Sequence, residues 1–207
     1  MVKVVTLPPN KETLTLLNLK PTVIITTVGK DGSTNAAPYS RFSIVDYNPP
    51  QALLSTNMKR DTYRNILETK EFVINYPGTD LLKQIWVTSK HFPYGVGELE
   101  KANLTGFPSE KVKPPRIREC KAHIECKVLW TKPIGSSCVV LGDIVSISAS
   151  TIMEQLETRQ KMIRLNPPLY FAFQEDEMTR KWMFAEIGKI HTITEKDEEI
   201  QVTSERL

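Results

Sequence analysis

Short strand-like runs separated by turn residues constrain the fold of this chain more than any other feature. The runs are rich in β-branched and aromatic residues and cover 23–28, 41–47, 52–56, 72–76, 120–130 and 138–148. Asp31-Gly32 tolerates the positive φ angles of a tight hairpin turn and separates the first run from a paired segment at 34–37. The chain has 207 residues, no internal repeat and no linker. The pattern predicts one mainly β domain with the strand spacing of a barrel.

Three segments have helical spacing instead. They cover 62–69, 80–88 and 153–164. In the first of them, Tyr63, Ile66 and Leu67 fall on one face. We expect three short helices, with Asp61 as the N-cap of the first.

The turn that leads into this first helix has the composition of a phosphate site. Its neutral hydrogen-bonding residues are Ser55, Thr56, Asn57 and Thr62, and its cations are Lys59 and Arg60. A helix N-terminus offers free backbone N–H groups and a favourable dipole to an anion. The segment therefore predicts phosphate binding, whereas an ordinary loop with two solvated cations remains the alternative.

The order of the motifs carries a family resemblance. Pro21-Thr22-Val23 is followed by Asn35-Ala36-Ala37-Pro38, Ser40-x-Phe42, Pro49-Pro50, the segment 61–75 and, further on, 100–105 and 123–126. In this order the chain resembles the flavin reductase-like family of FMN-binding split barrels, to which flavoredoxins and NAD(P)H:flavin reductases belong. The resemblance implies a split β-barrel with Greek-key connections. It further implies an N-terminal extension over 1–20, the flavin reductase-like domain over 21–150, and a C-terminal helix and apolar extension over 151–207.

The resemblance also implies a cofactor and its binding residues. The ring system of FMN is expected to meet Asn35, Ala36, Ala37 and Ser40, where small side chains let backbone N–H groups approach the ring. The full set of expected cofactor-binding residues is Asn35, Ala36, Ala37, Pro38, Ser40, Phe42, Ser55, Thr56, Asn57, Lys59, Arg60, Asp61 and Thr62.

No catalytic triad is needed for the chemistry that the resemblance implies, because a reduced nicotinamide passes its hydride directly to the flavin. Lys101 is a candidate for stabilising the reduced ring, and a solvated helix lysine is the alternative. His91, Phe92 and Tyr94 are candidates for binding the substrate over the ring, and a packing cluster under the loop is the alternative.

Composition excludes several other functions. A net charge of +3 is too mild to indicate a nucleic-acid partner. Three cysteines and the lack of an apolar stretch long enough to span a bilayer favour a cytoplasmic protein without membrane contact. Strand alternation places Cys120 and Cys126 about 20 Å apart on an inward face, with His123 and Glu125 facing outward. A metal site is therefore not expected.

Two regions outside the cofactor motifs have open roles. The basic stretch 111–118 is expected to be a solvated strand edge, with a site for the 2′-phosphate of NADPH as the alternative. The segments 167–173 and 182–189 carry apolar surface that should be buried, against the barrel or against a dimer partner. We expect a homodimer.

The function expected from the resemblance is FMN-dependent transfer of hydride or electrons from NAD(P)H to free flavin or another acceptor. Two alternatives stay open at this point. One is a flavoredoxin-like carrier that holds FMN tightly and exchanges electrons with a redox protein partner. The other is a flavin-binding module without turnover, or a related oxidase barrel.

Overall fold

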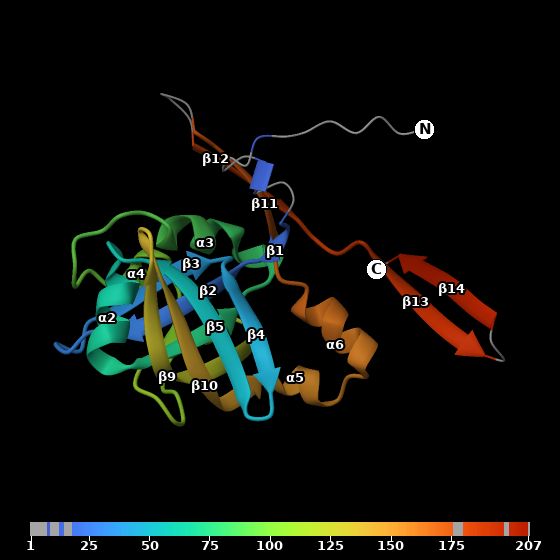
Figure 1. Ribbon diagram of the computed structural model, residues 1–207, viewed down its shortest axis with the longest axis horizontal. Coiled ribbons are helices and arrows are strands. Elements are labelled where there is room, and N and C mark those ends of the chain that lie inside the picture. Colours follow the sequence, from blue (N-terminus) through green and yellow to red (C-terminus); the bar gives the residue numbers. More distant parts are fainter. Residues whose placement is uncertain (1–7, 9–12, 15–17, 176–179, 197–198, 207) are drawn as a thin grey trace.

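The computed structural model describes residues 8, 13–14, 18–175, 180–196 and 199–206 (Figure 1). The helices are α2 (Asp61–Thr69), η1 (a 3-10 turn, Thr79–Leu81), α3 (Leu82–Thr88), α4 (Glu98–Lys101), α5 (Thr151–Glu154) and α6 (Thr158–Leu165). The strands of the N-terminal half are β1 (Lys20–Pro21), β2 (Val23–Val28), β3 (Thr34–Tyr39), β4 (Phe42–Tyr47), β5 (Pro50–Asn57) and β6 (Glu71–Tyr76). Those that follow are β7 (Gly106–Phe107), β8 (Arg116–Ile117), β9 (Ala122–Ile134), β10 (Ser137–Ala149), β11 (Leu169–Glu175), β12 (Arg180–Ala185), β13 (Lys189–Lys196) and β14 (Glu199–Arg206).

Seven antiparallel strands form the main sheet, in the order β3-β2-β6-β9-β10-β5-β4. β3 and β4 follow one another in the chain, yet they are the two outer strands of this sheet and do not pair with each other. β5 and β6 lie on opposite sides of the β9–β10 hairpin, so α2 crosses between them (Figure 1). The result is a barrel that is open between β3 and β4. The predicted mainly β split barrel is confirmed.

The hydrophobic core has two parts, one on each face of β2. Val23 and Ile25 point into the barrel with Leu54, Phe72 and other residues of the first cluster. Ile24 points the other way, into a second cluster under α3 and α4. Because successive side chains of a strand point to opposite faces, a strand covered on both sides needs a continuous apolar run. This accounts for the unbroken Val-Ile-Ile sequence.

The β2–β3 hairpin forms where Asp31-Gly32 predicts it. Gly32 has φ +84°, which the missing side chain permits. Its amide donates to the carbonyl of Gly29 at 3.0 Å, and the amide of Gly29 donates to the carbonyl of Ser33 at 2.9 Å. The turn thereby fixes the register that places Asn35 opposite Thr27.

Two sequence predictions about the elements are wrong. The expected helix 153–164 is two helices, α5 and α6, because the chain turns between them and the amide of Glu157 binds the side chain of Gln160 at 3.1 Å. His123 and Glu125 were expected to face solvent from β9 but are only 5% and 1% exposed. The reason is that residues 106–118 cover this face. The Glu125 carboxylate accepts hydrogen bonds from the amides of Glu110 and Lys111.

The C-terminal segment folds back onto the chain through its first hairpin. β11 pairs with β12 and with β1, and the amide of Thr22 donates to the carbonyl of Pro168 at 2.8 Å. The second hairpin, β13–β14, stands apart from the barrel in Figure 1. None of the helices in the described ranges has the length and apolar composition needed for a bilayer span.

Candidate functional site

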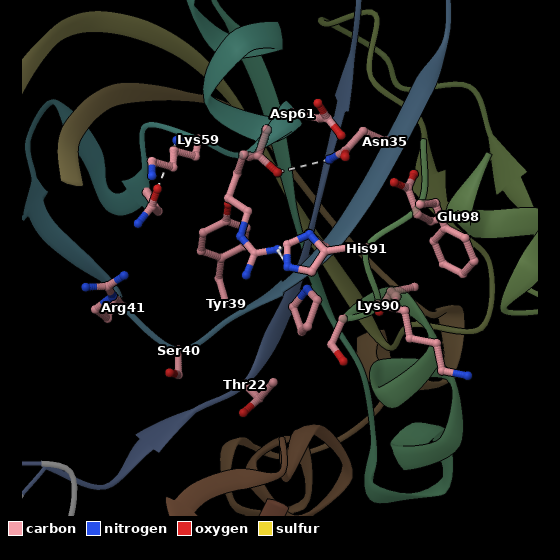
Figure 2. Close-up of a pocket in the computed structure, with 18 of the residues that line it drawn as sticks. Thr22, Asn35, Tyr39, Ser40, Arg41, Lys59, Asp61, Lys90, His91 and Glu98 are labelled. Atoms are coloured by element: carbon pink, nitrogen blue, oxygen red, sulfur yellow. Dashed lines mark hydrogen bonds between the residues drawn. The ribbon is translucent and has the colours of Figure 1, made fainter. Parts of the chain in front are cut away.

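A cavity of about 440 Å³ opens beside β3, within the size range of small-molecule sites. Its walls come from β3, from the turn between β5 and α2, from the last residue of α3 and residues 89–92 after it, from α4, and from β11 and β12. Parts of the chain far apart in sequence therefore meet around one space (Figure 2).

The turn between β5 and α2 presents an uncapped helix N-terminus to this cavity. α2 begins at Asp61, and Arg60 occupies the N-cap position with no side-chain cap hydrogen bond. The prediction that Asp61 is the cap is therefore wrong. In the described part of the chain, the amides of Asp61 and Thr62 have no acceptor. Because an arginine side chain cannot accept a hydrogen bond, these amides remain available to an anion.

The same turn is held in one conformation by its own hydrogen bonds. The side-chain oxygen of Asn57 accepts from the amide of Lys59 at 2.9 Å, and the carbonyl of Asn57 accepts from the amide of Arg60 at 3.1 Å. The side chains of Lys59 and Arg60 are exposed and line the cavity together with Arg41. Figure 2 shows Lys59 and Arg41 toward the same end of the cavity. This end is positively charged.

Arg60 and His91 stack on one another at the mouth of the cavity. Nη1 of Arg60 lies 3.1 Å from both ring nitrogens of His91. The two nitrogens flank one ring carbon, so an atom equally close to both would collide with that carbon if it lay in the ring plane. Nη1 of Arg60 must therefore lie over the ring face. The pair connects the β5–α2 turn to the segment after α3.

A buried polar network fixes α2 against the sheet below the cavity. Nδ2 of Asn35 donates to the hydroxyl of Thr62 at 3.0 Å and to that of Thr27 at 3.4 Å. Asn65 also donates to Thr27, at 3.1 Å, and accepts from the hydroxyl of Tyr94 at 3.4 Å. Buried polar groups that are all hydrogen-bonded specify one geometry. The network therefore sets the direction in which the N-terminus of α2 points.

Two protonatable side chains line the cavity in largely buried positions. Glu98 is 7% exposed and accepts a hydrogen bond from the amide of Ala36 at 3.2 Å. Burial raises the pKa of Glu98 above the ordinary carboxyl value, and the nearby charge of Asp61 raises it further. Burial also raises the pKa of Tyr39, whose hydroxyl lies 2.7 Å from that of Thr56.

The β11–β12 hairpin contributes an aromatic wall. Tyr170 of β11 and Phe184 of β12 both line the cavity. Their ring centroids lie 6.0 Å apart with an interplanar angle of 70°, an edge-to-face arrangement. Phe184 also packs against the second core cluster. The apolar extension therefore completes the cavity from the same chain.

The structure brings most of the predicted site residues together. Those that line the cavity are Asn35, Ala37, Pro38, Ser40, Asn57, Lys59, Arg60, Asp61, Thr62, His91 and Phe92. Tyr94 lines a smaller cavity behind α4, and Lys101 is exposed outside both. Ser55, Thr56, Ala36 and Phe42 do not line the main cavity. The last three contribute by packing or by hydrogen bonds beneath the surface.

Several lining residues were missed by the sequence analysis. They are Thr22, Tyr39, Arg41, Thr88, Ser89, Lys90, Glu98, Tyr170 and Phe184. Tyr39 and Arg41 adjoin predicted residues and could have been found from the strand and its turn. Glu98 lies three residues before Lys101 on the same short helix. The sequence analysis chose Lys101 there because a cation can stabilise the reduced ring. Tyr170 and Phe184 have no local signal.

The basic stretch 111–118 lies outside this site. Nη2 of Arg116 donates to the carbonyl of Pro108 at 2.8 Å, and its guanidinium lies 4.5 Å from the ring centre of Phe107. Arg116 also pairs with Glu125 at 3.7 Å. Its bonds are thus made within the protein, away from the cavity.

The described residues contain no cluster of His, Cys, Asp or Glu that could hold a metal ion.

The fold is that of a split-barrel protein, and its cavity beside β3 is lined by cations and by the uncapped start of α2. Residues 18–176 match the flavin reductase like domain. The chain therefore belongs to the flavin reductase-like family.

The chain is also similar to an individual relative and to two solved structures. An uncharacterized protein of Aquifex aeolicus is 36% identical over 151 residues, which are 70% of this chain and 77% of that protein. Component B of nitrilotriacetate monooxygenase from Bacillus cereus has a similar structure, with a TM-score of 0.78, 26% identity, and coverage of 91% of this chain and 98% of that one. The flavoredoxin of Desulfovibrio vulgaris (Miyazaki F) has a TM-score of 0.72 at 18% identity, with coverage of 89% and 93%. The family supports a flavin-related redox function.

Proposed function

We propose that this protein is an oxidoreductase that binds FMN in the cavity beside β3 and passes electrons from NAD(P)H through the flavin to an acceptor. The observation that carries the proposal is the uncapped N-terminus of α2. Two free amides and the cations Lys59 and Arg60 face one end of a cavity of about 440 Å³ in a chain of the flavin reductase-like family.

The donor set fits a phosphate monoester at this end. The amides of Asp61 and Thr62, together with Lys59 and Arg60, can neutralise and hydrogen-bond one phosphate group. We therefore favour FMN over a dinucleotide flavin, whose second phosphate would need a further set of donors.

The remainder of the cavity fits a planar ring. Ala37 and Pro38 of β3 present small or flat side chains, and Asn35 and Ser40 supply polar groups at the same wall. When bound, FMN supplies hydride and electron transfer, whereas the protein supplies position, electrostatics and exclusion of water. The residues Asn35, Ala37, Pro38 and Ser40 would orient the ring.

The electron donor and the assembly are further parts of this proposal. The nicotinamide would lie against the ring at the aromatic wall of Tyr170 and Phe184. Large apolar side chains are exposed on β4, β9 and β10, namely Val45, Tyr47, Leu129, Trp130, Ile134 and Ile147. Exposed apolar surface of this kind supports a homodimer.

The three cysteines are buried free thiols, which fits a reducing compartment such as the cytoplasm.

The test is an absorbance spectrum of the purified protein with added FMN, followed by anaerobic NADPH and then NADH. Binding of FMN and prompt bleaching of its visible bands would support the reductase function and identify the donor. If the bands resist both nucleotides but bleach with a reduced redox protein, the protein is an electron carrier and not a reductase. A protein that does not bind FMN at all would overturn the proposal.

A further inference from the structure

Glu98 lies where two cavities meet. It lines the main cavity, and it also lines a second cavity of about 10 Å³, close to the volume that one water molecule requires. The second cavity is polar, with Asn35, Asn65 and Tyr94 among its lining residues, and Gly95 at its outer side is exposed. A water molecule there could hydrogen-bond to several of these groups. Glu98 is thus placed between the ligand space and a polar route toward solvent.

The carboxyl group of Glu98 has few of the partners that a buried carboxylate needs. Oε2 accepts the amide of Ala36 at 3.2 Å, and the backbone amide of Glu98 itself is the other donor to the carboxyl group. No cation of the described chain lies within 4.0 Å of either oxygen. An unpaired carboxylate that is 93% buried is costly, and protonation removes most of that cost. The second oxygen is therefore a site for a proton.

The groups around Glu98 do not offset this cost. Tyr39 is the one titratable side chain of β3, which packs against α4, and α3 contributes only the exposed Lys83, which lines neither cavity. Besides Glu98, the charged or titratable residues that line the two cavities are Tyr39, Arg41, Lys59, Arg60, Asp61, Lys90, His91, Tyr94 and Tyr170. Asp61 is acidic and favours the protonated form, and Arg60 is stacked on His91. On α4 itself, Glu100 and Lys101 are exposed.

We propose that Glu98 is the residue that holds a proton in the ligand-free cavity and delivers it to the flavin bound there, with the small polar cavity as its route to solvent. This inference rests on the proposed function. Hydride transfer from a nicotinamide supplies two electrons and one hydrogen, and the neutral reduced ring requires one more proton. Glu98 gives up the proton of its Oε1–H bond, the bonding pair remains on the carboxylate, and solvent returns a proton through the small cavity.

Binding itself should reveal this proton. A ring that covers Glu98 removes more water from the carboxyl group and so raises its pKa further. At pH values between the pKa of the free protein and that of the complex, binding therefore takes up a proton. The affinity falls by up to about tenfold per pH unit as pH rises through this interval.

The experiment is calorimetric titration of FMN into the full chain across pH, in two buffers with different ionisation enthalpies, which gives the number of protons taken up. The phosphate of FMN itself titrates at about pH 6. The proton uptake of Glu98 is therefore measured as the difference between wild type and Glu98→Gln. The amide keeps an acceptor for Ala36 but cannot exchange a proton. Glu100→Gln removes the same charge from an exposed position on the same helix and serves as the control.

We expect wild type and Glu100→Gln to take up a fraction of a proton that Glu98→Gln does not, and only Glu98→Gln to lose the accompanying decline in affinity. Equal uptake in all three proteins, with FMN bound, would overturn the role of Glu98 and leave the proposed function standing. Absence of FMN binding in wild type would overturn both. If Glu98→Gln does not fold, Glu98→Asp takes its place and should keep the proton uptake but at a shifted pH. A pH profile of uptake identical to that of wild type would count against the proposal.

Discussion

The two walls of the cavity are built in different ways. One wall comes from β3 and the β5–α2 turn, residues 35–62, whose contacts are set by neighbouring strands and one helix start. The other wall comes from residues 88–98 and from Tyr170 and Phe184, which arrive from distant parts of the chain. The first wall carries the cations and free amides, and the second carries the aromatic rings and the buried acid. Under the proposed function, the first wall holds the phosphate and orients the ring, whereas the second governs what reaches the ring.

Removing both cations from the first wall should have the largest effect on FMN binding. Lys59→Ala with Arg60→Ala removes the charge-assisted contacts to phosphate and should weaken binding by about 1–3 kcal/mol, roughly 5- to 150-fold in Kd. Fluorescence titration of FMN measures this. Lys30→Ala with Lys83→Ala removes two exposed lysines outside the cavity and is the control. Equal affinity in the two double variants would show that the phosphate lies elsewhere.

The free amides of α2 give a second, finer test of the first wall. Arg60→Ser supplies a hydroxyl at the N-cap position that can accept an amide hydrogen bond, whereas Arg60→Ala does not. The serine variant should be more stable to urea than the alanine variant by about 0.5–2 kcal/mol. It should also bind FMN more weakly than the alanine variant, because its hydroxyl competes with phosphate for the same donors. A serine variant that gains stability and keeps the affinity of the alanine variant would remove the amides from the phosphate site.

The second wall should respond in a different measurement. Tyr170→Leu keeps apolar bulk but loses the ring, so an edge-to-face contact worth about 0.5–1.5 kcal/mol disappears. We expect a higher KM for the nicotinamide and an FMN Kd within about threefold of wild type, about 0.6 kcal/mol. Tyr47→Leu, at a side chain that is 86% exposed outside the cavity, is the control. A loss of FMN affinity as large as that of the double cation variant would break the division between the walls.

The same division explains what the sequence could predict. β2 was predicted to its ends, and Asp31-Gly32 marked the hairpin, because strand alternation and turn chemistry act between near neighbours. The sequence likewise indicated that the β5–α2 turn gathers hydrogen-bond donors and cations at a helix start, and its binding of an anion stays a prediction. Asp61 was misassigned as the cap because an acidic residue is favoured both at the N-cap and in the first turn. Composition cannot separate these two positions.

The second wall could not be predicted for a physical reason. Tyr170 reaches the cavity because β11 pairs with β1, which places Tyr170 opposite Lys20 from the far end of the chain, a contact that no local pattern encodes. His123 and Glu125 were assigned to solvent because a strand period tells which side chains share a face, but not what covers that face. Residues 106–118 supply the cover, through hydrogen bonds to Glu125. Long-range cover of this kind decides which polar residues become buried.

The stack of Arg60 on His91 is the point where the two walls touch, and it should have the smallest effect. Nη1 lies over the imidazole face, so the stack restrains the guanidinium while its other nitrogens remain free to bind phosphate. His91→Ala should weaken FMN binding by about 0.5–1 kcal/mol, the range for an exposed cation over an aromatic ring. His91→Phe keeps a ring face for Arg60 and should retain most of the affinity. In the Arg60→Ala background both substitutions should have no effect. Tighter binding in His91→Ala would show instead that the stack competes with the ligand for Arg60, and that the walls must separate before FMN binds.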